Sequence, residues 1–369
     1  MEPRLAAIFS QFSVSAMPTS ATGLTSGHIN DTWRIDTESG QSYVLQRLNP
    51  IAFPDPDAVM ANKLAVTEHL LKRAGGRGFG KAVPGFLPLR RGGFLLRDNQ
   101  GGAWNLMPFI GPSRSYLVAP DVHIAREAGQ TLGLFLSQTS DLDPALLSET
   151  LPGFHNLERR LAEFDAAKDS ADPRRCEDAA PTIDTVTELR ESMLGIEQLR
   201  QAGVIPERVT HNDTKLPNML FTPQGKGLCM IDLDTVMPGI LHYDFGDAVR
   251  MLCNSGAEDD PNPDHIKVRL DYFEAFVEGM FGEGTLVPRT GETTALADSP
   301  AVMAFIVGLR MLTDFLQRDR YFAIAYPGHN LVRARAQLAL ARRFSDSRAP
   351  MEDAIESALQ SAAQAGRTG

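Results

Sequence analysis

Residues 209–234 read VTHNDTKLPNMLFTPQGKGLCMIDLD, and this stretch decides how the second half of the chain folds. Two apolar runs, NMLFT and LCMID, flank the turn-forming sequence PQGKG, a pattern that predicts a β-hairpin with polar residues at both of its ends. Asp213 and Asn218 stand at its start, and Asp232 ends it. Because a hairpin returns the chain to its starting point, we expect these three side chains to lie close together.

His211, Asp213 and Asn218 have the spacing H-x-D-x-x-x-x-N, which is typical of the catalytic loop of kinases. Phosphoryl transfer requires a hydroxyl aimed in line at a γ-phosphate whose negative charge is offset. We therefore expect Asp213 to orient the acceptor hydroxyl and take its proton, and Lys215 to neutralise charge at the γ-phosphate. The alternative is that Asp213 and Asn218 only close a turn, as Asp and Asn commonly do.

A divalent cation is expected beside these residues, because the phosphates of ATP need one during transfer. Mg²⁺ prefers hard oxygen ligands and takes the remainder from water and substrate. Asn218 offers a neutral oxygen and Asp232 a charged one, and Asp234 is a third candidate ligand at the same strand end. The predicted metal is thus Mg²⁺, held against the phosphates of the phosphoryl donor.

The composition limits the class of protein. At 369 residues the chain is long enough for two packed units, and its fractions of 43% hydrophobic and 22% charged residues are those of a globular protein. A net charge of −10 argues against nucleic acid or anionic lipid as a partner. Three widely spaced cysteines without a CxxC pair disfavour a zinc site and fit a reducing cytoplasm. We expect a cytoplasmic protein without a membrane span, and the sequence leaves its oligomeric state open.

The first 110 residues have the pattern of a small antiparallel sheet with one helix. Strands are predicted over residues 32–36 and 42–48, and again in FLPLRRGGFLLRD (86–98), around a Gly-Gly turn, and AWNLMPFIG (103–111). Between them, residues 57–74 have the apolar spacing of a helix that ends at a glycine pair.

From Pro120 onward the pattern is helical. Helices are predicted over residues 125–138, 185–203, 265–281 and 299–317, with two more from Asn330 to the end, while the polar segment 165–182, which contains Pro173 and Pro181, is predicted as a surface loop. The fold class is therefore α+β: a bilobal, protein-kinase-like fold with a nucleotide-binding lobe over 1–110 and a catalytic and acceptor-binding lobe over 111–369.

HNDTKLPNMLF followed by MIDLDTVMPGILHYDFGDAVRM resembles the aminoglycoside phosphotransferase and choline kinase superfamily. With RMLTDFL and HNLVRARAQLAL added, the wording is most similar to that of the bacterial N-acetylhexosamine 1-kinases. The resemblance implies ATP, Mg²⁺ and a sugar acceptor, with Asp213 as catalytic base and Asn218 and Asp232 as metal ligands. It also implies that Asp244 and Asp247 brace the catalytic loop.

The nucleotide side of the site is predicted from GLTSGHINDTWRI (23–35), where kinases of this family have a turn that covers the phosphates. Gly27, His28 and Asn30 are the candidate phosphate contacts, although glycines before a strand are more often ordinary turn residues. The next strand should deliver a lysine but carries Gln46 and Arg47 instead. We expect Arg47, or alternatively Gln46, to take over its role.

Two apolar residues are the candidates for contact with the adenine. Met107 and Phe109 lie on the strand that should pass it, although both would serve equally well as plain core residues. Glu68 is the only acidic residue in the middle of the predicted helix 57–74, where a partner for the missing lysine would be expected.

The candidate acceptor contacts are Arg310 and Asp314, which share one helical face, together with His329 and Asn330. A simple i,i+4 salt bridge would explain Arg310 and Asp314 without a ligand. Two rival functions stay open: a kinase for another small acceptor, of the aminoglycoside, choline or homoserine type, and a nonenzymatic nucleotide-binding pseudokinase. Loss of a catalytic residue would mark the pseudokinase, but all three are present.

Overall fold

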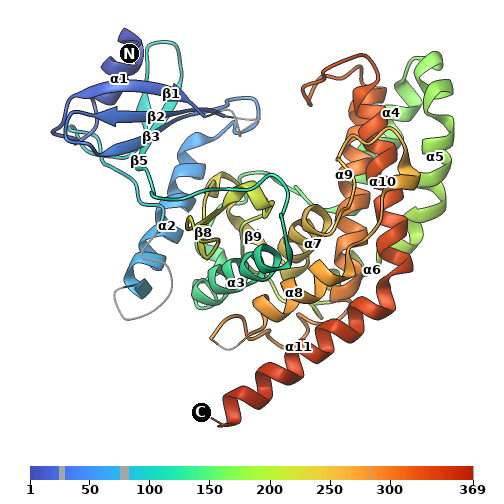
Figure 1. Cartoon of the computed structure of the whole chain (residues 1–369). Helices are drawn as coiled ribbons and strands as arrows, with labels where there is room; N and C mark the ends of the chain where they lie inside the picture. The colour runs from blue at the N-terminus through green and yellow to red at the C-terminus, as the bar shows by residue number, and fades with distance from the viewer. Residues whose placement is uncertain (25–29, 75–82, 283, 369) are drawn as a thin grey trace.

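The computed structural model describes residues 1–24, 30–74, 83–282 and 284–368. A small β-sheet forms one lobe, and most of the helices gather in a second, larger lobe (Figure 1). The catalytic hairpin lies between them at the centre of the molecule (Figure 1). The predicted α+β, bilobal kinase-like fold is confirmed.

The sheet of the first lobe is antiparallel and has the strand order β1-β2-β3-β5-β4. Its strands are β1 (Pro18–Gly23), β2 (Asp31–Thr37), β3 (Ser42–Leu48), β4 (Leu96–Arg97) and β5 (Ala103–Pro108). The inward-facing side chains Ile35, Leu45 and Leu106 are fully buried, and Phe9 of α1 (Pro3–Phe9) covers them. This alternation of buried and exposed residues is what fixes the register of a half-buried sheet.

The predicted pair of strands within residues 86–98 is wrong except at its turn. The turn forms, because the Leu89 N–H donates to the Gly93 carbonyl and both Gly92 and Gly93 have positive φ. Only the two-residue strand β4 follows it, and Leu89 itself makes an isolated bridge with Phe12. The backbone here pairs with two other segments, residues 11–13 and β5, so its two halves do not pair with each other.

Helix α2 (Pro56–Ala74) joins the two lobes. Val59, near its start, packs with Leu48 and Ala103 beneath the sheet, whereas Val66 and Leu70 belong to the core of the large lobe. The Asn62 side chain donates 2.9 Å to the Val236 carbonyl, which follows the catalytic hairpin. Helix α2, which the sequence analysis assigns to the first lobe, therefore packs against both lobes.

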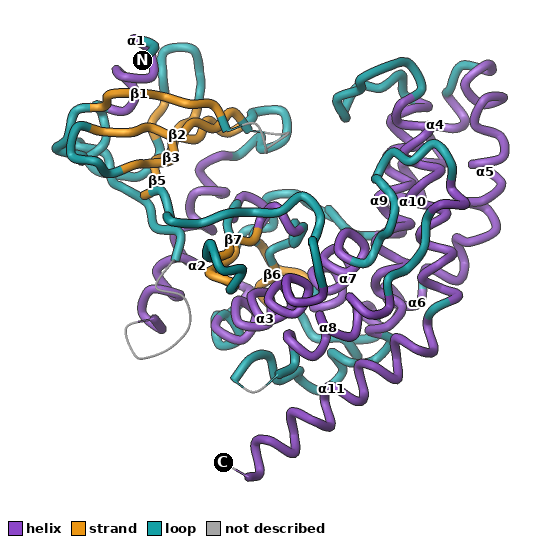
Figure 2. Tube along the Cα trace, in the orientation of Figure 1, coloured by secondary structure: helices purple, strands orange, loops and turns teal. Residues whose placement is uncertain are grey.

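Figure 2 shows that the large lobe is mainly helical, with short strands at the catalytic hairpin and in a small two-stranded sheet beside it. Its α-helices are α3 (Val122–Gln138), α4 (Leu157–Ser170), α5 (Pro173–Met193), α6 (Gly195–Gln201), α7 (Leu241–Leu252), α8 (Leu270–Met280), α9 (Ser299–Leu316), α10 (His329–Asp346) and α11 (Arg348–Thr368). Short 3₁₀ turns are η1 (Pro144–Leu146), η2 (Leu216–Asn218), η3 (Leu233–Thr235), η4 (Pro263–His265) and η5 (Leu296–Asp298). The strands are β6 (Arg208–Thr210), β7 (Met219–Phe221), β8 (Gly227–Met230) and β9 (Met237–Gly239).

The prediction of a loop over residues 165–182 is wrong, because α4 continues to Ser170 and α5 begins at Pro173. Pro173 occupies the first turn of α5, where the missing N–H costs nothing, and the Asp172 carboxylate caps the helix at Arg174 N–H. Pro181 lies on the exposed side of the same helix. The narrow buried face of α5, against α9, gives too weak a periodic signal for a sequence prediction.

Two helix boundaries also differ from prediction. The segment predicted over 265–281 becomes helical only at Leu270, because an isolated bridge between Asn254 and Val268 keeps the preceding residues extended. The segment predicted over 185–203 is divided at Leu194 between α5 and α6.

Helix α9 is the centre of the large lobe. Its apolar stretch Leu296–Leu316 is long enough to cross a membrane by length and composition, but 89% of it is buried within the fold. Packing against α4, α5, α7 and α10 accounts for this composition. Of the two charged residues of α9, Arg310 and Asp314, only Arg310 forms no hydrogen bond or ion pair within the part of the chain that the structure describes.

Candidate active site

The catalytic hairpin brings the predicted residues together. Strands β7 and β8 pair Met219 with Met230, and the Ile231 N–H donates 2.8 Å to the Asn218 carbonyl. The Asp213 carboxylate oxygen Oδ2 accepts a 2.8 Å hydrogen bond from Asn218 Nδ2 and lies 2.9 Å from Lys215 Nζ. Burial works against the charged lysine, but the Asp213 carboxylate outweighs it and raises the pKa of Lys215.

Helix α7 holds the catalytic loop in place. Asp244 accepts hydrogen bonds from the backbone N–H groups of His211 at 2.8 Å and Asn212 at 2.7 Å, and Asp247 accepts one from Thr214 N–H at 2.9 Å. Burial raises the pKa of Asp244 to about 7, although these N–H groups oppose the rise. Both aspartates therefore act on the loop backbone, which is the bracing role that the resemblance implies.

His211 is a second support of the loop. Its ring is buried, Nδ1 accepts from Asp213 N–H at 3.3 Å, and Nε2 lies 2.9 Å from the Ile231 carbonyl, which requires the proton on Nε2. Burial lowers the pKa of His211, so the imidazole is neutral near pH 7. It ties the start of the loop to the end of the hairpin.

Asp232 and Asn218 present oxygen atoms to the same cleft. The Asp232 carboxylate accepts no hydrogen bond from any residue that the structure describes, and burial, with the charges of Asp234 and Asp213, raises its pKa to about 8. Asn218 uses its Nδ2 on Asp213 and leaves Oδ1 for a ligand. A cation that displaces the proton of Asp232 would find one anionic oxygen there and one neutral oxygen on Asn218, a pair that fits Mg²⁺.

A cation at this position would need further oxygens from phosphate and water. Within the described ranges, no group of three or more His, Cys, Asp or Glu side chains has the geometry of a metal site. Mg²⁺ in kinases is commonly held by one or two protein ligands together with substrate phosphates, so the donor set suits a cation that arrives with a nucleotide.

Asp234 does not fit its predicted role as a metal ligand. Its Oδ1 forms an ion pair with Lys63 Nζ, while Oδ2 accepts hydrogen bonds from Gln46 Nε2, at 2.9 Å, and from Asn30 Nδ2. All three donors come from the first lobe and α2. Asp234 lines the same cleft as Asp232, but with both oxygens occupied and only 3% of the residue exposed it joins the lobes.

A cleft of about 390 Å³ lies between the sheet and the catalytic hairpin. Val44, Met107 and Phe109 line its apolar end from the sheet side, and Leu220 and Ile231 line it from the hairpin. Met107 and Phe109 thus lie where an adenine contact is predicted. Asn30 lies at the polar end, and the other two phosphate candidates, Gly27 and His28, lie outside the described residues.

Arg47 does not take the place of the missing lysine. It lies 3.6 Å from Asp31 and 5.8 Å from the centre of the Trp104 ring, on the face of β3 away from the cleft. Successive residues of a strand face opposite sides, so Gln46 is the one that lines the cleft.

Sequence reasoning missed Lys63, which lines the cleft from α2. Its signal was present in the sequence: Val59, Lys63, Val66 and Leu70 share helical spacing, so a lysine lies on the buried stripe of an amphipathic helix. Glu68, the acidic candidate on this helix, is exposed and faces away from that stripe.

A second pocket of about 270 Å³ lies beside the catalytic loop, between α4, α9 and the loop after α9. His155 connects the two, because its Nε2 lies 3.1 Å from the Asn212 carbonyl and its ring packs 4.3 Å from that of Phe154, which lines the pocket. Burial lowers the pKa of His155 to about 3, so the ring is neutral and donates through Nε2. Because two of the predicted acceptor contacts, Arg310 and Asp314, line this space, we name it the acceptor pocket.

Arg310 lies at the centre of the acceptor pocket. Its guanidinium stands over the rings of Phe154 at 4.9 Å, Phe322 at 5.5 Å and Tyr321 at 5.6 Å. Over the described part of the chain, its side chain makes neither a hydrogen bond nor an ion pair, so the alternative of a salt bridge with Asp314 is wrong. Burial and the nearby Arg160 lower its pKa to about 10, which leaves it charged near pH 7.

Three other predicted acceptor contacts support a loop instead. Asp314 accepts from the backbone N–H groups of Arg320, Tyr321 and Phe322, at 2.8 to 2.9 Å, and from Asn330 Nδ2 at 3.0 Å. His329 Nδ1 accepts from Ala325 N–H, and its Nε2 lies 3.1 Å from Asp259. Asp314, His329 and Asn330 thus hold the loop that carries Tyr321 and Phe322 against Arg310.

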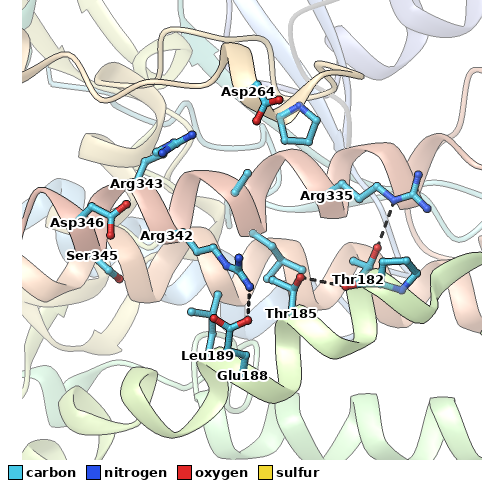
Figure 3. A pocket seen from close by; sticks show the side chains of 14 residues that line it. Thr182, Thr185, Glu188, Leu189, Asp264, Arg335, Arg342, Arg343, Ser345 and Asp346 are labelled. Carbon is cyan, nitrogen blue, oxygen red and sulfur yellow. Dashed lines mark hydrogen bonds and ion pairs between the residues drawn. The ribbon is translucent and has the colours of Figure 1, made fainter.

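The groove in Figure 3, of about 650 Å³, lies between α5 and α10. Arg342 pairs with Glu188 across it, and Arg335 reaches Thr182 Oγ1 at 3.3 Å (Figure 3). Among the described residues, none of the predicted site residues lines this groove. It is therefore a packing groove between two helices and does not include the catalytic centre.

Comparison with solved structures agrees with this fold. The chain is similar to a microcompartment-associated aminopropanol kinase (17% identity, TM-score 0.64, covering 94% of this chain and 98% of the other) and to an amicoumacin kinase in complex with AMP-PNP and Ca²⁺ (16%, 0.60, 92% and 93%). It is also similar to choline kinase from Cryptosporidium parvum Iowa II (13%, 0.54, 91% and 93%).

The family is shown by a sequence model. The model of the phosphotransferase enzyme family, APH, matches residues 20–276, which include most of the first lobe, Lys63, the whole catalytic hairpin and the large lobe as far as α8. The chain therefore belongs to the phosphotransferase enzyme family and is an ATP-dependent small-molecule kinase.

Proposed function

We propose that this kinase transfers the γ-phosphoryl group of ATP to the anomeric hydroxyl of a hexose, an N-acetylhexosamine, and so forms a sugar 1-phosphate. The observation that carries the proposal is the acceptor pocket, in which Arg310 stands among three aromatic rings with no acidic partner on the described chain. Its N–H groups are available to the oxygens of an acceptor, and the rings offer apolar surface to the face of a sugar.

The charge of the pocket argues against an amine as acceptor. Arg159, Arg160 and Arg310 line it, while its acids are already used: Glu163 pairs with Arg159 at 2.9 Å and Arg160 at 2.7 Å, and Asp314 with backbone N–H groups. An ammonium group would meet excess positive charge here, and such repulsion disfavours a ligand strongly. A neutral sugar has no such conflict.

The chain's own residues can carry out the transfer. Asp213 is placed to orient the acceptor hydroxyl and take its proton, because its carboxylate is fixed by Asn218 and lines the cleft. Lys215, paired with Asp213, supplies positive charge at the transferred group. Asn218 and Asp232 would hold Mg²⁺, which offsets the charge of the phosphates when bound.

The test is phosphorus NMR of the products formed from Mg-ATP and a panel of acceptors: N-acetylglucosamine, N-acetylgalactosamine, glucose, galactose, choline, ethanolamine and an aminoglycoside. We expect a phosphorus signal coupled to an anomeric proton with at least one N-acetylhexosamine. Methyl N-acetylglucosaminide, whose anomeric oxygen is blocked, is the matched control and should give no product. Transfer to a 6-hydroxyl would overturn the proposal. So would transfer to an amine-bearing acceptor alone.

A further inference from the structure

Lys63 is a buried cation at the polar end of the nucleotide cleft. Only 1% of the residue is exposed, and its Nζ contacts Asp234 Oδ1 and, at 2.9 Å, Gln46 Oε1. An ammonium group has three N–H donors, and two are used here. The third finds no oxygen acceptor in the part of the chain that the structure describes, where only the face of the Phe86 ring lies near, 5.2 Å from Nζ. The side chain lines the same cleft as Asp213, Asn218 and Asp232.

Gln46 occupies the position on β3 that the kinase pattern gives to a lysine. Its amide bridges Lys63 and Asp234, because Oε1 accepts from Lys63 Nζ while Nε2 donates 2.9 Å to Asp234 Oδ2. Asn105 Nδ2 also donates 3.0 Å to Oε1, which fixes the amide in this orientation. Strand β3 therefore contributes the neutral amide of Gln46 at this position, and α2 contributes the positive charge of Lys63.

The ion pair also has an unusual place in the fold. The general kinase arrangement pairs a lysine of strand β3 with a glutamate of the neighbouring helix, both in the first lobe. Here the helix supplies the lysine, and the acid, Asp234, follows the catalytic hairpin of the second lobe. Asn62, the neighbour of Lys63, bonds to the Val236 carbonyl and holds α2 against the same segment.

We propose that Lys63 is the first-lobe cation that binds the nucleotide phosphates, and that Asp234 is its positioning residue, so that the ion pair organising the nucleotide site runs between the lobes. This inference rests on the ATP-dependent kinase activity and not on the identity of the acceptor. The phosphate takes the third N–H of Lys63, while Asp234 and Gln46 keep the other two.

The test compares nucleotide binding without any acceptor. Isothermal titration calorimetry in Mg²⁺ buffer gives the dissociation constants for ADP and for adenosine, which lacks phosphate. In Lys63→Met, we expect the dissociation constant for ADP to rise about 10- to 100-fold, the range for a lost hydrogen bond to a charged group, with adenosine unchanged. Lys72→Met removes the same charge from an exposed position of α2 and should leave both constants unchanged.

Loss of Lys63 alone leaves the Asp234 carboxylate buried without its cation, which endangers folding. Lys63→Met/Asp234→Asn removes both charges and keeps the shape of the acid, so it separates phosphate binding from lobe pairing. We expect the loss of ADP affinity to persist in it. The proposal is wrong if this double variant binds ADP like the parent. It is equally wrong if the affinities for ADP and adenosine fall by the same factor, since that would show a purely structural role.

Discussion

The catalytic loop and the acceptor pocket are neighbours, joined through His155, but they satisfy their polar groups in opposite ways. In the loop, protein groups hold both the Asp213 carboxylate, which contacts Asn218 and Lys215, and the backbone, which donates to Asp244 and Asp247. In the pocket, the Arg310 guanidinium has aromatic neighbours but no acidic partner in the described chain. The protein itself fixes Asp213 in the loop, whereas under the proposed function the acceptor supplies the missing partner of Arg310 in the pocket.

This difference has a kinetic meaning. A group that is fixed in advance lowers the free energy of the transition state, so its loss reduces turnover. A group whose partner is the acceptor contributes to binding, so its loss raises the KM for the acceptor. Substitutions in the two regions should therefore separate into two classes.

The largest effect is expected at Asp213. Asp213→Asn keeps the size of the side chain but removes the base, and turnover should fall by about two to four orders of magnitude, the range of general-base catalysis. The KM for the acceptor should change little. Steady-state kinetics measure both, with the exposed Asp353→Asn as control. Turnover close to that of the parent would refute the assignment of the base.

A smaller effect is expected from the bracing of the loop. Asp244→Asn replaces one acceptor oxygen by an NH₂ group, so either His211 N–H or Asn212 N–H loses its partner in a fully buried place. The free energy of unfolding should fall by about 1–3 kcal/mol, the cost of one unsatisfied buried group. Turnover should fall while the acceptor KM does not, and denaturant unfolding with kinetics would show this. A raised acceptor KM at unchanged turnover would show that Asp244 supports acceptor binding and not the catalytic loop.

The acceptor pocket should give the opposite result. Arg310→Met keeps the apolar stem and removes the donors, and the KM for the acceptor should rise about 10- to 100-fold, as for a lost charged hydrogen bond, with turnover at saturation largely kept. Arg159→Met, at the same pocket but already paired with Glu163, is the matched control and should change the KM less. Equal effects of the two substitutions would show that net charge, and not the guanidinium of Arg310, binds the acceptor.

The smallest effect is expected at His242, which lies outside the catalytic loop and the acceptor pocket. It concerns the pH dependence of the free energy of unfolding. Burial lowers the pKa of His242 to about 4, so the folded protein keeps this ring neutral while the unfolded chain protonates it below about pH 6.5. The unfolded state then binds more protons, and the stability contributed by His242 falls as pH falls from 6.5 toward 4. Between pH 7.5 and 5.5 this loss should reach about 1.4 kcal/mol.

Comparison of the parent with His242→Gln isolates this contribution, because Asp232 and Asp244 have raised pKa values and give the opposite slope. The advantage of the parent over the variant, measured by urea unfolding, should shrink as the solution is acidified. His123→Gln, at an exposed position, should show no such pH dependence. An advantage that is constant from pH 7.5 to 5.5 would show that His242 becomes protonated without unfolding.

Much of the fold was predictable because its signals are local. The helices over 57–74 and 299–317 and the strands over 32–36 and 42–48 agree closely with α2, α9, β2 and β3, since each carries a clear apolar period. The loop predicted around Pro173 failed because a charged helix with a narrow buried face has little periodic signal. The strands predicted in 86–98 failed because the partners of that backbone come from elsewhere in the chain.

By itself the sequence determined that Asp213, Asn218 and Asp232, the predicted catalytic and metal-binding residues, lie close together, because one loop and one hairpin position them and the geometry of both depends on neighbouring residues. It did not determine the other charges. Lys63 and its partner Asp234 are 171 residues apart in the sequence. Arg310 forms no salt bridge with Asp314, because the Asp314 carboxylate already accepts hydrogen bonds from backbone N–H groups. Which partner a long charged side chain finds depends on distances across the folded molecule, and those distances exist only once the lobes have packed together.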